Sequence, residues 1–433
     1  MSRSSIPEDM QEEILLRLPV KSILCFKSVC KSWYALLSSR KFIEDHLNIA
    51  TKNHLRNRKI MIGVYDTDFK ADNIFYSIDY ASLLSPTSSR CDGAVLMDYP
   101  NDNNAITDDN IHSIIGSCNG LILLWAEPSE TLYLWNPSTR EYREIIGAPT
   151  AIENLSYGFG YDAKTDNYKL VCIATGFSND IGELDDFSEV YIYIAGSWSR
   201  GQNIPYSCSD GTEAVLLNGV LHWLGETVHW TGDTATHEET IISFDINSEK
   251  FMDLPFPEGT MTSPEQSLDV QVLGDSLCLV SSVGKVRVDV WVMQNYGVRE
   301  SWTKEFTITQ EIITANPSSL TFYGFTKNGE ILIQLDDCFG LYDRKNNSLR
   351  ILNLNGTIDG YLFSESYVES LVSVTSTMEQ KQKKYTGEVQ DSHLEKISEV
   401  IMEAVADKEA KRKRNELTES NITSKRKRVI TKN

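Results

Sequence analysis

Three histidines near the middle of the chain come nearest to a metal site. His222, His229 and His237 lie seven and eight positions apart, with Trp223 and Trp230 between them. No usual zinc site has its ligands at these spacings. A histidine in a Leu-His-Trp segment is typical of a packed strand position. We therefore predict no metal site.

The cysteines and serines form no recognisable catalytic set. The eight cysteines stand at positions 25, 30, 91, 118, 172, 208, 278 and 338, and no two form a CxxC pair. Scattered thiols of this kind are typical of reduced, mostly buried cysteines in an intracellular protein. No GxSxG, P-loop or GxGxxG fingerprint occurs. The sequence therefore predicts no cofactor and no catalytic residue.

Two compact basic clusters near the C-terminus favour nuclear import. The polar residues that surround them predict a flexible tail over residues 375–433, with one short amphipathic helix, Ser392–Lys411. Clusters of this kind are typical of an import signal or a weak nucleic-acid patch, and a solvated basic tail is the alternative. We expect the protein in nucleus and cytoplasm. The eight residues are Lys411, Arg412, Lys413, Arg414, Lys425, Arg426, Lys427 and Arg428.

The charge is divided unevenly along the chain. The formal net charge is −20, and residues 375–433 carry 14 basic and 10 acidic residues, which leaves −24 for residues 1–374. A strongly acidic body argues against nucleic acid as the main partner and permits a basic protein partner. Acidity that serves solubility alone is the other explanation. No run of eighteen apolar residues occurs, so we predict no transmembrane helix and no membrane partner.

The first 45 residues carry the apolar spacing of a small helical unit. Met10, Ile14 and Leu18 recur every four residues, which places them on one face of a first helix that we expect Pro19 to stop. Ile23, Phe26, Cys30, Trp33 and Leu37 continue at steps of three and four and predict one or two further helices.

So small a unit buries little surface alone, so either a partner protein or the following domain should cover it. A DNA-binding helix-turn-helix is a third possibility. The six basic and six acidic residues of positions 6–45 argue against it, because a net charge of zero is a poor footprint for phosphate binding.

This stretch resembles the F-box motif of plant F-box proteins over almost its whole length. The match runs through Ile6-Pro7-Glu8-Asp9, Arg17-Leu18-Pro19-Val20-Lys21-Ser22, Phe26–Trp33 and the closing Phe42, with Ile6 and Cys25 as departures from the usual leucine and arginine. The resemblance implies that residues 1–45 form an F-box domain that binds a Skp-type adaptor and, through it, cullin and RING subunits. The implied adaptor-binding residues are Ile6, Pro7, Leu15, Leu18, Pro19, Val20, Leu24, Val29, Cys30 and Trp33.

Residues 55–374 contain strands throughout, in a repeat of about fifty residues. Equivalent aromatic or apolar strands start near Leu134, Ile192, Phe244, Val290 and Tyr342, at separations of 58, 52, 46 and 52 residues. Repeats of roughly this length with about four strands each predict a β-propeller. We expect six blades, with seven or an irregular ring as alternatives, and expect Tyr367–Val374 to close the ring on Arg58–Tyr65. The predicted fold class is mainly β with a small α domain.

This body resembles the F-box-associated region of plant F-box proteins, a group that includes S-locus F-box proteins and F-box proteins that restrain immune receptors. The resemblance rests on Cys118-Asn119-Gly120-Leu121, Trp135–Thr139, Gly158–Asp162, Asp166–Lys169 and Tyr367–Leu371. No Gly-Gly doublet of a true kelch repeat occurs, so kelch-like describes shape only.

Together the two resemblances imply the substrate-recognition subunit of a cullin–RING ubiquitin ligase, with no catalysis of its own. A nuclear propeller scaffold that degrades nothing is the alternative. Enzymatic propellers also exist, and substrate turnover by the isolated body would indicate one.

Overall fold

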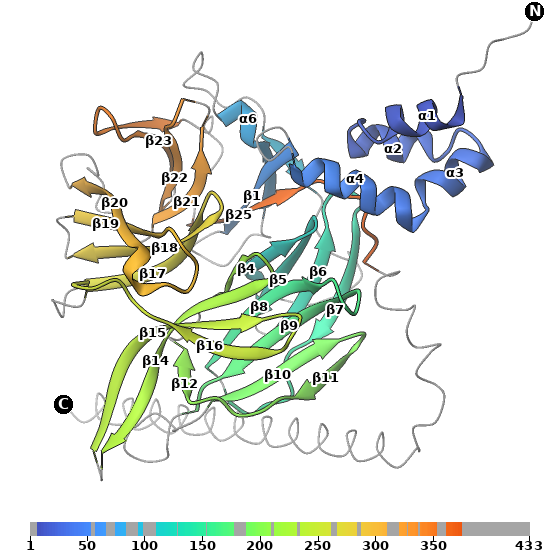
Figure 1. The fold of residues 1–433 in the computed structure, drawn as a ribbon. Helices are drawn as coiled ribbons and strands as arrows, with labels where there is room; N and C mark the ends of the chain where they lie inside the picture. Colours follow the sequence, from blue (N-terminus) through green and yellow to red (C-terminus); the bar gives the residue numbers. More distant parts are fainter. Residues whose placement is uncertain are drawn as a thin grey trace, which may run out of the picture.

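The computed structural model describes a helical module and a ring of β-sheets (Figure 1). The described residues are 7–52, 57–65, 74–83, 94–97, 110–127, 129–152, 154–176, 188–208, 212–231, 234–260, 266–283, 287–309, 320–326, 328–336, 338–352 and 361–374.

Four helices form the N-terminal module: α1 (Glu8–Leu15), α2 (Val20–Phe26), α3 (Lys31–Leu37) and α4 (Arg40–Lys52). The expectation that the first helix runs to Pro19 is wrong. Helix α1 ends at Leu15, and Pro19 is the N-cap of α2, where its missing N–H costs no helical hydrogen bond. The fourth helix crosses the expected domain boundary at residue 45, because its apolar face finds partners on both sides.

Six antiparallel sheets follow one another around the ring, and we number them as blades 1 to 6. Blade 1 contains β4 (Asn110–Cys118), β5 (Leu121–Glu127), β6 (Thr131–Asn136) and β7 (Glu141–Ile146). Blade 2 contains β8 (Leu155–Asp162), β9 (Asn167–Ala174), β10 (Glu189–Ile194) and β11 (Ser197–Arg200). Blade 3 contains β12 (Tyr206–Cys208), β13 (Val215–Leu217), β14 (Val220–Thr231), β15 (Thr234–Asp245) and β16 (Lys250–Leu254).

The remaining blades have four strands each. Blade 4 contains β17 (Gln266–Leu273), β18 (Ser276–Val283), β19 (Arg287–Met293) and β20 (Trp302–Thr309). Blade 5 contains β21 (Leu320–Phe325), β22 (Ile331–Leu335), β23 (Cys338–Asp343) and β24 (Ser348–Leu352). Blade 6 contains β25 (Tyr361–Val368), β1 (Arg58–Tyr65), β2 (Ile74–Asp79) and β3 (Val95–Met97), with the short helix α6 (Tyr80–Leu83) after β2. The five equivalent strands expected from the repeat are β6, β10, β15, β19 and β23, and the six-bladed propeller is confirmed.

One type of turn recurs in four of the blades, where it joins two antiparallel strands. The last residue of a strand accepts backbone N–H bonds on its side-chain oxygen, and four residues later a residue adopts a positive φ. Side chains that bond their own backbone in this way favour turns over continued strand. The pairs are Asn136 with Arg140, Asp162 with Asp166, Asp245 with Glu249, and Asp343 with Asn347.

The ring closes in blade 6, where strands from the two ends of the propeller meet. Strand β25 pairs antiparallel with β1, from Arg58 opposite Val368 to Tyr65 opposite Tyr361. Closure on β1 is as expected, but the expected closing strand, Tyr367–Val374, is displaced. The strand ends at Val368 because the residues after it turn away and find their hydrogen-bond partners in blade 1.

Candidate functional site

The helical module packs around a small apolar core that includes one residue from the far end of the propeller. The buried members of this core are Leu15, Val20, Ile23, Leu37, Phe42 and Leu371. Leu371 follows the last strand and is only 2% exposed. The sequence left open whether a partner or the following domain covers the helices. The structure shows that the propeller's last segment covers part of them.

The ten expected adaptor-binding residues occupy three different environments. Leu15 and Val20 are both 2% exposed and belong to the core, so their direct contribution to a docking surface is small. Leu18, Leu24 and Trp33 are half-buried against that core. Pro7, Pro19, Val29 and Cys30 are exposed, and Ile6 lies outside the described residues.

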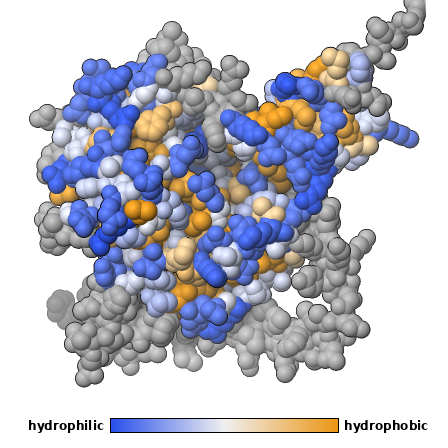
Figure 2. Space-filling view, in the orientation of Figure 1, coloured by the Kyte–Doolittle hydropathy of each residue, from blue (hydrophilic) through white to orange (hydrophobic). Residues whose placement is uncertain are grey.

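An apolar surface on the module remains uncovered in the described part of the chain. Met10 and Ile14 are 59% and 52% exposed, and Val29 and Tyr34 are 61% and 60% exposed. Met10 and Ile14 are four residues apart, so they share one face of α1. Figure 2 shows apolar surface gathered on this module. Met10, Ile14 and Tyr34 are exposed but are not among the ten expected adaptor-binding residues. We call these four residues the helical surface.

A histidine of α4 contacts the backbone of the loop that joins α1 to α2. His46 of α4 is buried, and its Nε2 lies 2.9 Å from the Leu18 carbonyl oxygen. Phe42 stacks on the same ring, with 6.3 Å between the ring centroids. The loop at Leu18 and Pro19 is therefore positioned by α4.

The segment 369–374 joins the helical module to blade 1. The Asn136 side-chain amide donates to the carbonyl oxygens of Ser370, at 3.2 Å, and Val372, at 2.7 Å. Glu141 Oε2 accepts from the Val374 backbone N–H at 3.0 Å. These bonds hold Leu371 where it can enter the helical core.

Helix α4 makes its own contacts with the propeller. Ile43 and Leu47 pack against the apolar core between blades 1 and 2. Arg40 Nη1 pairs with Asp166 Oδ2 at 2.5 Å, although both side chains are largely exposed. Helix α4 therefore contacts both the helical core and the propeller core.

Of the three histidines considered for a metal site, only His222 has a described side chain. His222 is completely buried, and its Nε2 lies 2.8 Å from the Tyr296 hydroxyl. Burial lowers the pKa of His222 to about 4, so the ring is neutral near pH 7. His229 and His237 lie farther along the β14–β15 hairpin, where side chains are outside the description. No group of three His, Cys, Asp or Glu side chains in the described ranges is placed to hold a metal ion.

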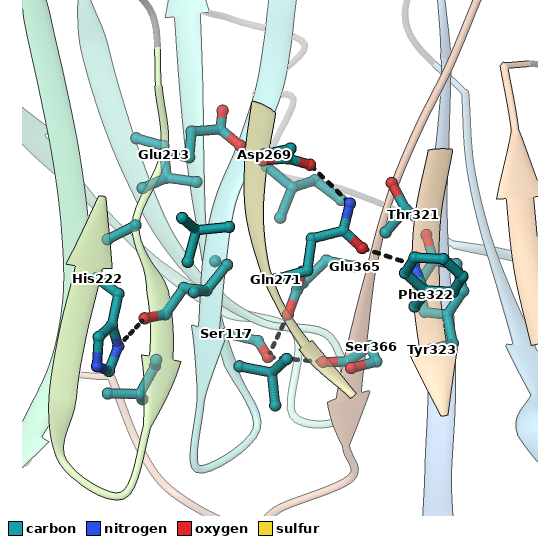
Figure 3. Close-up of a pocket in the computed structure, with 18 of the residues that line it drawn as sticks. Ser117, Glu213, His222, Asp269, Gln271, Thr321, Phe322, Tyr323, Glu365 and Ser366 are labelled. Atoms are coloured by element: carbon teal, nitrogen blue, oxygen red, sulfur yellow. Dashed lines mark hydrogen bonds between the residues drawn. The ribbon is translucent and has the colours of Figure 1, made fainter. Parts of the chain in front are cut away.

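An axial cavity of about 560 Å³ is lined by all six blades (Figure 3). Around the axis, the first strand of one blade contacts the first strand of the next, as β25 does β4 and β4 does β8. Its walls carry apolar side chains such as Leu224, Leu268 and Val272, together with three carboxylates. The carboxylates are Glu213, Asp269 and Glu365, from three blades that lie far apart in sequence.

The environment of the three carboxylates disfavours their charged forms. Burial, followed by the charges of Glu365 and Asp269, raises the pKa of Glu213 to about 7. Burial also raises the pKa of Glu365 to about 7, against the opposing charge of Arg58, and raises that of Asp269. Ser117 donates a hydrogen bond to Glu365 Oε1 at 3.1 Å. Sequence alone gave no signal for this set, because only the ring brings the three residues together.

The basic clusters 411–414 and 425–428, and the helix expected over Ser392–Lys411, lie outside the described residues. Among the described helices, none is long and apolar enough to cross a membrane.

Comparison with known proteins matches both parts of the chain. Residues 4–45 match the F-box domain, and residues 71–374 match the F-box associated beta propeller domain. An F-box/kelch-repeat protein of Arabidopsis thaliana is 28% identical over 325 residues, which are 71% of this chain and 80% of the relative. F-box protein CPR1 of Arabidopsis thaliana is 28% identical over 400 residues, 84% of this chain and 89% of the relative. A chain of a nidogen/laminin complex aligns over 72% of this chain and 99% of its own, with 9% identity and a TM-score of 0.39.

Proposed function

Because the chain belongs to the F-box proteins that carry an F-box associated β-propeller, we propose that it selects a target protein for ubiquitination and proteasomal degradation. Substrate recognition within an SCF-type ligase is the general role of this domain pair, and such proteins are receptors rather than catalysts. The helical module would bind the Skp-type adaptor, and the propeller would hold the target.

The helical surface is the observation that carries the proposal. Met10, Ile14, Val29 and Tyr34 are each more than half exposed on a module that already has a closed core. Exposed apolar groups that are grouped on one module are typical of a protein interface. Pro7, Pro19 and Cys30 are also exposed on this module and lie within the residues that match the F-box domain.

The connection between the two parts explains how such a receptor would work. Ubiquitin transfer belongs to other subunits, so this chain contributes proximity. Helix α4 and segment 369–374 fix the propeller relative to the adaptor-binding module. A bound target would then be presented at a constant distance and angle to the carrier enzyme.

The overall charge favours a basic target. Residues 1–374 carry a formal charge of −24, which would speed association with a basic protein at low ionic strength. We also propose that the protein acts in nucleus and cytoplasm, on the strength of the two basic clusters in its tail.

The test pairs target recovery with target turnover. Full-length protein and the variant Leu18→Ala with Pro19→Ala are purified under proteasome inhibition, and their partners are identified by mass spectrometry. Leu18 packs on the core and Pro19 is exposed, so the pair should lose adaptor binding by about 4 kcal/mol, near a thousandfold.

The variant should still recover the target and should lengthen its lifetime in cells. Recovery of the adaptor at the wild-type level would contradict the assignment. Unchanged target turnover despite loss of the adaptor would favour a scaffold that degrades nothing.

A further inference from the structure

The axial cavity contains acidic groups that the protein itself does not neutralise. In the described residues, Glu213, Asp269 and Glu365 form no salt bridge with any lysine or arginine. Arg58 is the one lysine or arginine among the residues that line the cavity, and its Nη1 donates to the Tyr323 carbonyl oxygen at 2.8 Å. All three residues line the interior of the ring, where the side chains of Glu213 and Asp269 are exposed to the cavity and that of Glu365 is half-buried, so their carboxylates can contact a cation that enters it.

Glu213 and Asp269 lack a cation most clearly. Arg58 partly offsets the charge of Glu365, whereas no positive group among the described residues acts on Glu213 or Asp269. Asp269 accepts a hydrogen bond from Gln271 Nε2 at 2.6 Å, and that amide also contacts blade 5 through the Leu320 carbonyl and the Phe322 N–H. Asp269 is thereby held in place, and Figure 3 shows Glu213 beside it at one end of the drawn cavity.

The shape of the cavity decides what kind of cation fits. A volume of about 560 Å³ lies within the range of roughly 300–1,000 Å³ that is typical of ligand sites, and is far larger than a bare ion needs. The acidic set does not have the geometry of a metal site in the described residues. Apolar walls at Leu224, Leu268 and Val272 suit an aliphatic stem that carries its charge at the tip.

The geometry points to this cavity as the receptor for a lysine or arginine side chain on a segment of the target protein, with Glu213 and Asp269 as its charged contacts. The inference rests on the proposed function, since it supplies the chemistry by which the propeller would recognise its target.

The probes are single amino acids with blocked ends, which test the side chain alone. N-acetyl-arginine amide and N-acetyl-lysine amide are titrated into the full-length protein, and ligand NMR reports the Kd. N-acetyl-citrulline amide and N-acetyl-norleucine amide are the uncharged matches. The cationic probes should bind at least about tenfold more tightly than their uncharged matches.

Paired variants locate the binding. The variant Glu213→Gln with Asp269→Asn keeps the size of both side chains and should reduce binding of the cationic probes to the level of the uncharged ones. The variant Glu144→Gln with Glu300→Gln removes the same charge from exposed positions outside the cavity and should bind as the wild type does. A thermal melt of each variant shows that the fold is kept.

Three results would overturn the inference. Equal loss in both double variants would show attraction by net charge alone. Equal binding of charged and uncharged probes would show a cavity without charge selectivity. Binding seen only in a chain that ends at Val374 would show that some part of residues 375–433 of the same chain, rather than a target, occupies the cavity.

Adaptor binding by the Glu213→Gln, Asp269→Asn variant separates this inference from the proposed function. The variant should bind the adaptor normally, because the helical surface is untouched. If wild-type protein failed to bind an adaptor but bound the cationic probes, the proposed function would fail and the cavity assignment would stand.

Discussion

Lys169 Nζ lies 2.9 Å from Asp162 Oδ2, and both side chains are buried in blade 2. The same ammonium group contacts Glu249 Oε1 at 2.5 Å and donates to the Ile246 carbonyl oxygen at 2.8 Å. Both of these partners belong to the β15–β16 turn of blade 3. Lys169 therefore pairs with a buried carboxylate of blade 2 and, through Glu249 and Ile246, links blade 2 to blade 3.

We expect Lys169→Met to destabilise the propeller by about 3–5 kcal/mol, because it leaves the buried Asp162 charge without its partner. Chemical denaturation measures the loss. Adding Asp162→Asn should restore part of it, since asparagine caps the equivalent turn at Asn136. The control is Arg200→Met, which breaks an exposed pair with Glu189 and should cost about 1 kcal/mol or less. If Lys169→Met lost no more stability than Arg200→Met, Lys169 would not link the two blades as described.

Leu371→Ala should loosen the helical module while the propeller stays folded. Removing a buried leucine typically costs about 2–5 kcal/mol, and Leu371 lies in the core made by α1 to α4. Hydrogen exchange should rise in residues 8–52 and stay low in blades 2 to 5. Ile351→Ala, on the outer strand of blade 5 at 46% exposure, is the matched control. Unchanged protection of the helices would mean that the module folds without the propeller's last segment.

The axial carboxylates should make stability depend on pH near neutrality. The pKa of Glu213 and of Glu365 is raised from 4.5 to about 7 in the folded protein, so the folded state holds protons that the unfolded chain releases between these values. Below pH 4.5 both carboxyls are protonated in the folded and in the unfolded state, and their contribution to the free energy of unfolding is fully present. As the pH rises through 7 the unfolded chain releases these protons more readily, and that contribution is lost.

His222 gives stability the opposite dependence on pH. Its pKa is lowered from 6.5 to about 4 in the folded protein, so as the pH falls the unfolded chain binds this proton before the folded protein does, and stability decreases. The test is therefore the difference in the free energy of unfolding between a variant and the wild type, both of which contain His222. Glu213→Gln with Glu365→Gln should gain stability over the wild type at about pH 7.5 and lose most of that gain at about pH 5.5. Denaturation curves at the two pH values measure this. A gain of equal size at both would show that the carboxylates do not titrate as described.

The basic tail should direct part of the protein to the nucleus. Truncation after Val374 removes both clusters and should shift a fluorescent fusion toward the cytoplasm. Glutamine in place of the eight basic residues should act like the truncation, and glutamine in place of Lys381, Lys383 and Lys384 is the control. An unchanged distribution in the substituted protein would contradict the import signal.

The repeat and the turns could be predicted from sequence because their causes are local. Asn-Gly pairs at positions 119–120 and 218–219 adopt positive φ at both residues, as two-residue hairpins require. The spacing of aromatic strands then fixed the period of the blades. Ring closure on Arg58–Tyr65 followed from the need to cover both outer faces.

The junction and the cavity could not be predicted, because their causes are tertiary. Leu371 has the pattern of one more strand residue, and only the side chains of Asn136 and Glu141 draw its segment away from the sheet. Lysine is usually found at protein surfaces, yet Lys169 is 2% exposed. Glu213, Asp269 and Glu365 meet only when the ring is closed. For the same reason the ten expected adaptor residues mixed core positions, such as Leu15, with exposed ones.

The most direct test of the receptor role is the Kd between the full-length protein and a Skp-type adaptor. Ile14→Glu changes an isoleucine that is 52% exposed on the helical surface, and Ile146→Glu changes one that is 80% exposed on blade 1. Both substitutions leave the cores intact. The account predicts that Ile14→Glu weakens adaptor binding by about 2 kcal/mol, roughly thirtyfold, and that Ile146→Glu leaves it unchanged. Absence of adaptor binding by the wild type, or equal Kd values for all three proteins, would contradict it.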